Sequence, residues 1–385
     1  MTRFWLYLAA VLTLVAIFLL AARAHAFPEM IRHGYVNCTV CHTTLVGGNL
    51  LTPYGRSLSK ELLSQTDFFG LQAPEGSENF LGGAIETPEW LLAGGDVRIL
   101  QSFIESPQAS RGRFMIMQVD FDLSAQVKDW LRVFFSVGRV EPRVDGAVAK
   151  DYVTSPRHGV EFILNPEAED DRVTLRVGRF TPAYGILFAE HTFATRTYLD
   201  FGPGQERGAA ELAWTHEMTS IVATGIYNQA NGNTVKKEMG GILQVNTALG
   251  ESTKVGANYY QTTRDDGAGS YQRRMYGVYA LMGFTKEWYG LLDLNRVQRA
   301  DGRWGFVETF KLGRELWQGF HLFGVHEFAN LNTDQTDPKF EAYSFGTQWY
   351  PQAHWELYGI YRKERNSATS GDFQDAVWLI GHYYL

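Results

Sequence analysis

Two cysteines and one histidine stand at a spacing that can do redox chemistry. The chain reads Cys38-Thr39-Val40-Cys41-His42 and holds no other cysteine. Thiols at positions i and i+3 lie on one side of a helical turn, where both can add to the vinyl groups of one haem. The adjacent histidine then lies under the iron as its proximal ligand. The pattern therefore predicts one covalently attached haem c.

Two other uses of paired thiols fit the sequence less well. A zinc site needs two more nitrogen or sulfur ligands, and no third cysteine exists to supply one. A redox disulfide of the thioredoxin kind belongs in an α/β pattern, which this sequence lacks. We therefore favour Cys38 and Cys41 as haem anchors, with His42 as the iron ligand.

The second axial ligand of the iron is left open by the sequence. Met30 and His33 both precede the motif closely, and methionine or histidine is the usual partner of a proximal histidine. His33 is near enough to Cys38 for its ring to fold back over the distal face of the haem. The alternatives are a surface role for His33, an open or water-ligated iron, and a ligand from the rest of the chain.

The first 26 residues have the features of a secretory signal peptide. Arg3 gives a positive start, residues 4–22 form an uninterrupted apolar run, and Ala24-His25-Ala26 is a cleavage signature. The apolar run is long for such a peptide, so an uncleaved anchor is the alternative. Export fits the motif, because haem c is attached outside the cytoplasm.

The composition excludes several classes of protein. An aromatic content of 14% excludes a disordered chain, and a net charge of −7 argues against a nucleic-acid binder. A mean hydropathy of −0.20 beside that aromatic content is typical of neither a helical membrane protein nor a cytosolic enzyme. After the signal peptide, no stretch has the about 20 consecutive apolar residues of a spanning helix.

Residues 27–88 form the segment that carries the motif. Thr52 and Pro53 make a good helix start, and the apolar spacing of Tyr54, Leu58 and Leu62 predicts one amphipathic helix over 53–65. This segment is short for a free-standing cytochrome. We therefore expect a neighbouring surface to cover the haem.

Residues 89–385 show hydrophobic alternation with a period of two. Val173, Leu175 and Val177 alternate with polar or small residues, and the same alternation places Met115 and Met117 on an apolar face. One apolar face and one mixed face are typical of a strand with lipid on one side and a polar lumen on the other. A soluble β-sandwich would put its polar residues outside and would have uniformly short turns.

The pattern predicts sixteen strands, an even number as bacterial single-chain barrels require. Short and long connections alternate, which places both termini in the periplasm. The longest connection, 182–205, is then the third external loop, which folds inward and narrows the channel in sixteen-stranded porins. Its residues suited to the lumen are His191, Phe193, Tyr198, Asp200 and Phe201.

Two further features support a membrane barrel. Aromatic residues at strand ends match interfacial girdles, namely Trp90, Trp130, Trp288, Trp304, Trp317, Trp349 and Trp355. The last strand runs to Leu385, like the insertion signal of outer-membrane proteins, although that signal commonly ends in phenylalanine. We expect an all-β fold, a transmembrane antiparallel barrel of about sixteen strands with a short α-helical haem segment.

A single haem motif joined to a porin-like barrel resembles the fused monohaem cytochrome c–porin family, which includes iron(II)-oxidising outer-membrane cytochromes. Members carry a pattern like P-x-F-A-R-Q-T-G-x-x-C-x-x-C-H after the signal peptide. Pro28 and Arg32 match that pattern, whereas Met30-Ile31 replaces F-A and His33-Gly34-Tyr35 replaces Q-T-G. These departures bear on whether the chain is specific for iron, more than on the expected barrel with its haem segment.

The resemblance implies an outer-membrane electron conduit with its haem at the periplasmic side or in the lumen. Electrons would pass between an extracellular partner, such as iron(II), and periplasmic c-type cytochromes, and the sequence leaves open whether this amounts to an iron(II) oxidase. Acidic residues expected on the lumen face could attract metal cations, namely Asp120, Asp122, Glu161 and Asp293. The alternatives are a solute channel with a haem-bearing plug or sensor, and a soluble periplasmic haem protein.

Overall fold

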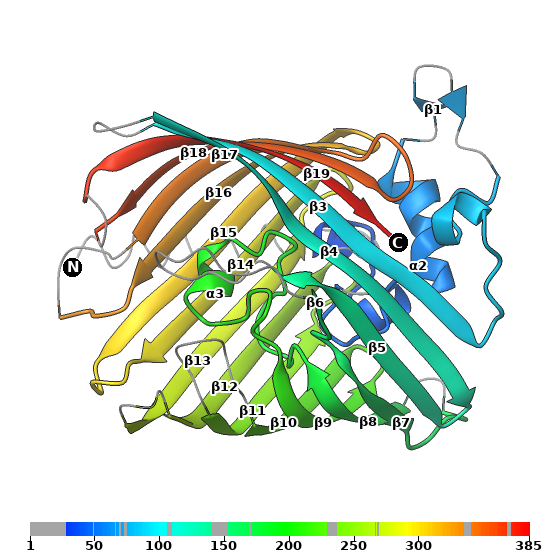
Figure 1. Ribbon diagram of the computed structural model, residues 1–385, viewed down its shortest axis with the longest axis horizontal. Coiled ribbons are helices and arrows are strands. Elements are labelled where there is room, and N and C mark those ends of the chain that lie inside the picture. The colour runs from blue at the N-terminus through cyan, green and yellow to red at the C-terminus, as the bar shows by residue number, and fades with distance from the viewer. Residues whose placement is uncertain are drawn as a thin grey trace.

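A closed wall of tilted strands surrounds the N-terminal segment and one long loop in the computed structural model of the chain (Figure 1). The structure describes residues 28–48, 50–65, 67–68, 71–72, 75–105, 110–140, 153–168, 171–228, 237–265, 267, 269–334, 340–367 and 371–385. The predicted signal peptide, 1–26, lies outside these residues. Among the helices of the described part, none is long and apolar enough to cross a membrane.

The wall has sixteen strand positions among the described residues, as the alternation predicts. Each strand pairs antiparallel with the next, and the last pairs with the first to close the barrel. The strands are β3 Leu91–Glu105, β4 Ser110–Lys128, β5 Leu131–Val140, β6 Val153–Thr154, β7 His158–Ile163, β8 Asp171–Phe180, β9 Arg207–His216, β10 Thr219–Asn228, β11 Lys237–Ala248, β12 Thr253–Asp265, β13 Ser270–Gly283, β14 Trp288–Gln298, β15 Trp304–Trp317, β16 Phe320–Asn330, β17 Phe340–Trp349, β18 Trp355–Asn366 and β19 Phe373–Tyr384. The short β6 and β7 pair with different parts of β5 and share one position.

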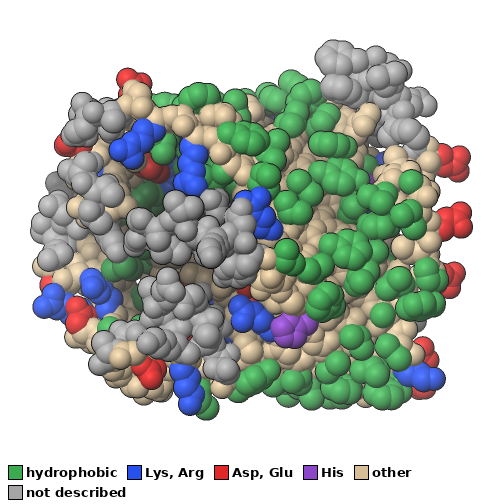
Figure 2. All heavy atoms as spheres, viewed as in Figure 1, with side chains coloured by type: hydrophobic (Ala, Val, Ile, Leu, Met, Phe, Trp, Pro, Cys, Tyr) green, Lys and Arg blue, Asp and Glu red, His purple; other side chains and the backbone are tan. Residues whose placement is uncertain are grey.

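The alternation sorts side chains between the two faces of the wall. In β5, Val133 and Phe135 are exposed on the outside, whereas Ser136 is buried in the lumen. Hydrophobic side chains form a broad band over the outer surface, with charged side chains at its two ends (Figure 2). The predicted fold class, an antiparallel barrel with an apolar outer face, is confirmed.

One part of β4 departs from the predicted alternation. The register shifts between Arg98 and Ile99 of β3, so that β4 carries one extra residue at Met117. Such a bulge exchanges the faces of the residues beyond it. Ile116 is therefore exposed on the outside, while Met117 lines a cavity in the lumen. The expectation that Met115 and Met117 belong to the apolar outer face is wrong for this reason.

The N-terminal segment consists of short helical turns. They are η1 Pro28–Arg32, η2 Cys38–Val40, α2 Pro53–Leu58, η3 Ser59–Leu63 and η4 Phe80–Gly83, with a small hairpin of β1 Asp67–Phe68 and β2 Leu71–Gln72. The helix expected over 53–65 is present as α2, which continues into the π-helical turn η3. The Thr52 hydroxyl accepts a hydrogen bond from the Gly55 amide at 3.0 Å, which confirms the predicted helix start.

The first turns of this segment lie inside the barrel, whereas α2 lies at the end where the short turns and the C-terminus are and the β1 hairpin projects beyond the wall (Figure 1). Arg32 forms an ion pair of 3.0 Å with Glu315 of β15. The Ser59 hydroxyl lies 2.9 Å from the Tyr384 hydroxyl of β19. Gly283 of β13 packs against the Arg32 backbone so closely that a Cβ atom there would overlap it. The wall thus holds the short segment through contacts at several places along it.

The connection 182–205 also folds into the lumen, as predicted, and carries the short helix α3, Ala194–Thr197 (Figure 1). Backbone amides of this loop donate to side chains of the wall. Gly185 donates to the Asn258 amide oxygen at 3.1 Å and Ala194 to a Glu327 carboxylate at 2.7 Å. We call residues 182–205 the inward loop below.

Candidate functional site

The Cys38–His42 motif forms a tight turn inside the barrel. Asn37 caps the turn, because its side-chain oxygen accepts from the Thr39 amide at 3.2 Å. The amides of Cys41 and His42 both donate to the Cys38 carbonyl, at 3.2 and 2.9 Å. Cys38 lines the cavity described below, whereas Cys41 is buried in a cluster with Met30 and Leu63. Attachment of one haem to both cysteines stays a prediction.

Helix α2 packs directly against the back of this turn. A Cβ atom at Gly55 would overlap the carbonyl oxygen of Cys41, so only glycine permits this approach. The Thr52 amide donates to the same carbonyl at 2.9 Å, and the Thr52 hydroxyl donates to the Val40 carbonyl at 2.8 Å. The motif is therefore held by backbone contacts that do not depend on its own side chains.

Burial sets the protonation of the candidate haem ligand. His42 is buried, and burial lowers the pKa of its imidazole to about 4 against an opposing backbone hydrogen bond with Gly48. The ring is therefore neutral at physiological pH, which is the form that ligates a metal. Burial also raises the pKa of the Cys41 thiol to about 12.

A cavity lies beside the motif and is lined by Cys38 and His42. Much of its apolar lining comes from the N-terminal segment and the inward loop, and the wall adds Met117 and Leu281. The residues from the two segments include Leu45, Val46, Leu51, Ile186, Leu187 and Phe188. The two chain segments touch here, because a Cβ atom at Gly48 would lie 3.0 Å from a methyl group of Leu187. The inward loop thus forms the wall of the cavity that the N-terminal segment leaves open.

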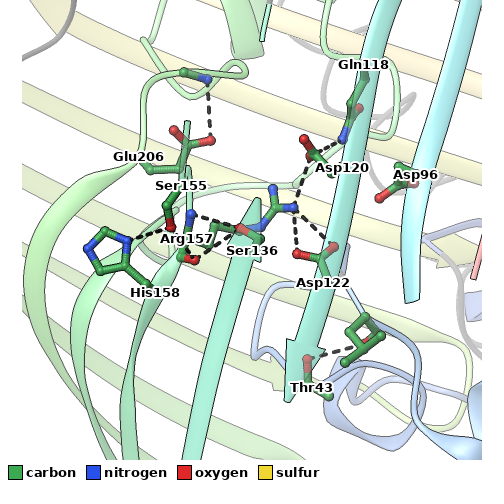
Figure 3. Close-up of polar contacts among 12 residues, drawn as sticks. Thr43, Asp96, Gln118, Asp120, Asp122, Ser136, Ser155, Arg157, His158 and Glu206 are labelled. Carbon is green, nitrogen blue, oxygen red and sulfur yellow. Dashed lines mark hydrogen bonds and ion pairs between the residues drawn. The ribbon is translucent and has the colours of Figure 1, made fainter. Parts of the chain in front are cut away.

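Charged residues of the barrel wall complete the lining of the cavity. Arg157 lies between two carboxylates of β4 and contacts Asp120 at 3.1 Å and Asp122 at 3.0 Å (Figure 3). His382 likewise lies between Asp96 at 2.8 Å and Glu356 at 2.7 Å. These carboxylates are therefore engaged by neighbouring cationic or imidazole groups.

The acidic residues expected to attract metal cations do face the lumen, but each has an internal partner. Asp120 and Asp122 contact Arg157, and Glu161 contacts Arg132 at 3.1 Å. Asp293 accepts from the Ile186 amide at 3.1 Å and so holds the inward loop. Within the described part of the chain, no group of three or more histidine, cysteine or acidic residues could hold a metal ion.

The two candidate distal ligands lie away from this cavity lining. Met30 is 1% exposed and packs in a cluster with Cys41, Leu51 and Leu63. Neither Met30 nor His33 lines the cavity, whereas Met117 and His191 do. Iron ligation by Met30 or His33 stays a prediction. Sequence reasoning missed Met117 because the bulge in β4 reverses its face.

Lys311 is a further residue that the sequence did not single out. It belongs to β15, is completely buried, and contacts the Glu29 carboxylate at 2.6 Å and the Glu190 carboxylate at 2.7 Å. Glu29 belongs to η1 and Glu190 to the inward loop. The alternation predicts that Lys311 faces the lumen. It does not predict the two partners of Lys311, because they lie in distant parts of the sequence.

Comparisons with known proteins relate this fold to porins. No family model matches the chain, and no curated protein matches it. OmpF of Salmonella typhi, solved with daunomycin, is 12% identical with a TM-score of 0.56, over 77% of this chain and 97% of OmpF. OmpT of Vibrio cholerae is 13% identical with a TM-score of 0.55, over 78% and 100%. An anion-selective porin from Comamonas acidovorans is 14% identical with a TM-score of 0.53, over 77% and 99%. At these identities the likeness shows a porin-like barrel fold.

Proposed function

We propose that this chain is an outer-membrane barrel that carries one covalent haem c in its lumen and passes electrons across the membrane. The partners would be an extracellular electron donor or acceptor, such as iron(II), and periplasmic c-type cytochromes. The observation that carries the proposal is the position of Cys38 and His42, which line a cavity inside a porin-like barrel, with Cys41 on the same turn of the chain.

The residues at this cavity fit a haem c. Cys38 and Cys41 would form thioether bonds with the two vinyl groups, and the neutral His42 would ligate the iron. The apolar side chains of the N-terminal segment and the inward loop would cover the macrocycle and exclude water. When bound, the haem supplies one-electron redox chemistry, which none of these side chains supplies alone.

The outer surface supports a place in the outer membrane. Exposed tryptophans lie near the end of the wall that carries the short turns, as an interfacial girdle requires. They are Trp90, Trp130, Trp288, Trp317 and Trp355. Trp349 instead donates a hydrogen bond to Gln65 at 3.2 Å and so contacts the N-terminal segment.

A redox group in the lumen would shorten the distance over which electrons must pass through the membrane. The hydrocarbon core is about 30 Å thick, so direct tunnelling between the two compartments is negligible. Lys311 holds both the N-terminal segment and the inward loop against the wall. In this proposal the barrel would hold the haem inside this layer and shield it from lipid.

A second function, a solute channel, is favoured by the likeness to porins such as the anion-selective porin from Comamonas acidovorans. In that function the N-terminal segment is a plug or sensor, and the inward loop is the constriction. This channel would conduct ions whether or not a haem is attached.

Replacement of both cysteines distinguishes the two functions. The Cys38→Ser, Cys41→Ser chain and the wild type would be purified from outer membranes, stained for covalent haem and incorporated into planar bilayers. The conduit predicts a haem stain on the heat-modifiable wild-type band only, with little ion conductance by the wild type. Absence of the stain from wild type, with equal and large conductance by both chains, would support the channel and contradict the conduit.

A further inference from the structure

Two arginines donate hydrogen bonds to successive backbone carbonyls of the inward loop. Arg98 of β3 donates to the Ala189 carbonyl at 2.6 Å, and Arg196 of α3 donates to the adjacent Phe188 carbonyl at 2.7 Å. Both arginines line the cavity that Cys38 and His42 also line. The loop backbone therefore fixes two guanidinium groups at one wall of the candidate haem site.

Arg196 has acceptors for its hydrogen bonds but no close counter-charge. Besides Phe188, it donates to the Phe201 carbonyl at 2.8 Å. Among the described residues, no carboxylate lies within ion-pair distance of it. Burial and the charge of Arg98 together lower the pKa of Arg196 to about 9, although Glu206 and Glu190 oppose this shift. A further anion close to Arg196 would stabilise its positive charge.

Among the described residues, one carboxylate lies within ion-pair distance of Arg98, namely Asp96 at 4.0 Å. Asp96 is itself in contact with His382 at 2.8 Å. Of the other carboxylates that line the cavity, Asp120 contacts Arg157 and Glu29 contacts Lys311. Glu356 contacts His382, and Glu206 lies 3.8 Å from Arg179. Among the described residues, no carboxylate thus lies closer than 4.0 Å to either arginine of this pair.

We infer that Arg98 and Arg196 bind the propionate carboxylates of the haem. This inference rests on the proposed function. The thioether bonds would fix the vinyl-bearing half of the macrocycle at Cys38 and Cys41, so the propionate-bearing half extends away from the motif toward the other walls. Two carboxylates would supply negative charge at these arginines, and guanidinium groups bind carboxylates with short, charge-assisted hydrogen bonds.

The test replaces each arginine by glutamine, which keeps amide donors and removes the charge. Arg98→Gln and Arg196→Gln would be purified in detergent beside a control, Arg132→Gln, whose arginine pairs with Glu161 and does not line the cavity. A nearby cation destabilises the ferric haem, so each of the two variants should have a lower reduction potential than the wild type. Their propionate bands in resonance Raman spectra should also shift, while the control keeps both values.

The outcomes separate this inference from the function on which it rests. If Arg98→Gln and Arg196→Gln carry haem with the wild-type reduction potential and propionate bands, the inference is wrong, but the proposed function is unaffected. If the wild type carries no covalent haem, the proposed function itself is wrong. Arg98 lies in the wall, outside the inward loop, so Arg98→Gln decides the matter alone should Arg196→Gln fail to form the heat-modifiable barrel.

Discussion

The Lys311 ammonium of the wall lies 2.6 Å from the Glu29 carboxylate of the N-terminal segment. The same ammonium lies 2.7 Å from Glu190 of the inward loop. One buried cation therefore joins three parts of the molecule that are far apart in the sequence. Because the N-terminal segment carries the Cys38–His42 motif, this contact also locates the motif relative to the barrel.

Lys311→Met should detach the N-terminal segment and the inward loop from the wall. Removing one partner of a buried ion pair costs about 3–5 kcal/mol, because the other partners remain buried without a counter-charge. Limited proteolysis of the folded protein should therefore cut residues 28–65 or the inward loop faster than in the wild type. The control is Lys363→Met, whose exposed lysine contacts Asp375 at 3.7 Å. Equal cleavage rates in all three proteins would contradict this role of Lys311.

Gly55→Ala should disturb the packing of α2 against the Cys38–His42 turn. The added Cβ atom would overlap the Cys41 carbonyl, so α2 must move away from the Cys38–His42 turn. We expect less covalent haem per folded barrel, measured by haem stain against the heat-modifiable band. Gly225→Ala is the matched control, since its Cβ atom would meet the nearest carbonyl oxygen only at 3.9 Å. A full haem content in Gly55→Ala would show that this packing is not needed.

Asp200 anchors the inward loop to the wall through two arginines, Arg264 at 2.6 Å and Arg273 at 2.7 Å. Although burial opposes ionisation, these arginines hold the pKa of Asp200 well below its usual range. A lowered pKa means that its stabilising effect is present above the unfolded pKa and is lost only as the pH falls through the folded value. The loop should therefore stay protected from protease at mildly acidic pH.

Asp200→Asn should remove this anchor at every pH. The uncharged amide leaves Arg264 and Arg273 without the Asp200 counter-charge, so we expect several-fold faster proteolysis within 182–205 at neutral pH. Asp301→Asn, in an exposed turn with Arg299 at 3.9 Å, is the control. Loss of loop protection in the wild type at a pH near the usual carboxyl range would contradict the account of Asp200.

Cys38→Ser with Cys41→Ser should remove the haem and leave the N-terminal segment in place. Arg56 donates to the Ala93 carbonyl, and Lys254 donates to the Val36 carbonyl at 2.9 Å, so the wall holds the segment without the thiols. Protease protection of residues 28–65 should match that of the wild type. Rapid cleavage of the segment in the double variant would show that the haem, and not the wall, holds it.

The fold was predictable because its main signal is local. Alternation of apolar residues within each strand is enough to predict sixteen strands. The spacing of long connections identifies the third external loop, and the resemblance to sixteen-stranded porins implies that this loop folds inward. Met117 escaped the prediction because a bulge depends on the pairing of β4 with β3, which no single strand displays.

The contacts of the site were less predictable, because they join residues distant in the sequence. The Cys38–His42 motif is recognisable from five consecutive residues, and so is the start of the helix at Thr52 and Pro53. By contrast, Lys311 meets Glu29 across most of the chain. The adjacent positions of Arg98 and Arg196 depend on two successive carbonyl groups of a folded loop.

The most direct test of the central claim is the absorption spectrum of the haem in intact cells that express this chain. A reductant that cannot cross the membrane would be added outside, with cells expressing the double cysteine variant as the control. The proposed conduit predicts that the wild-type haem becomes reduced and that the control shows no such signal. A haem that is present in the outer membrane but stays oxidised until the cells are broken would contradict it.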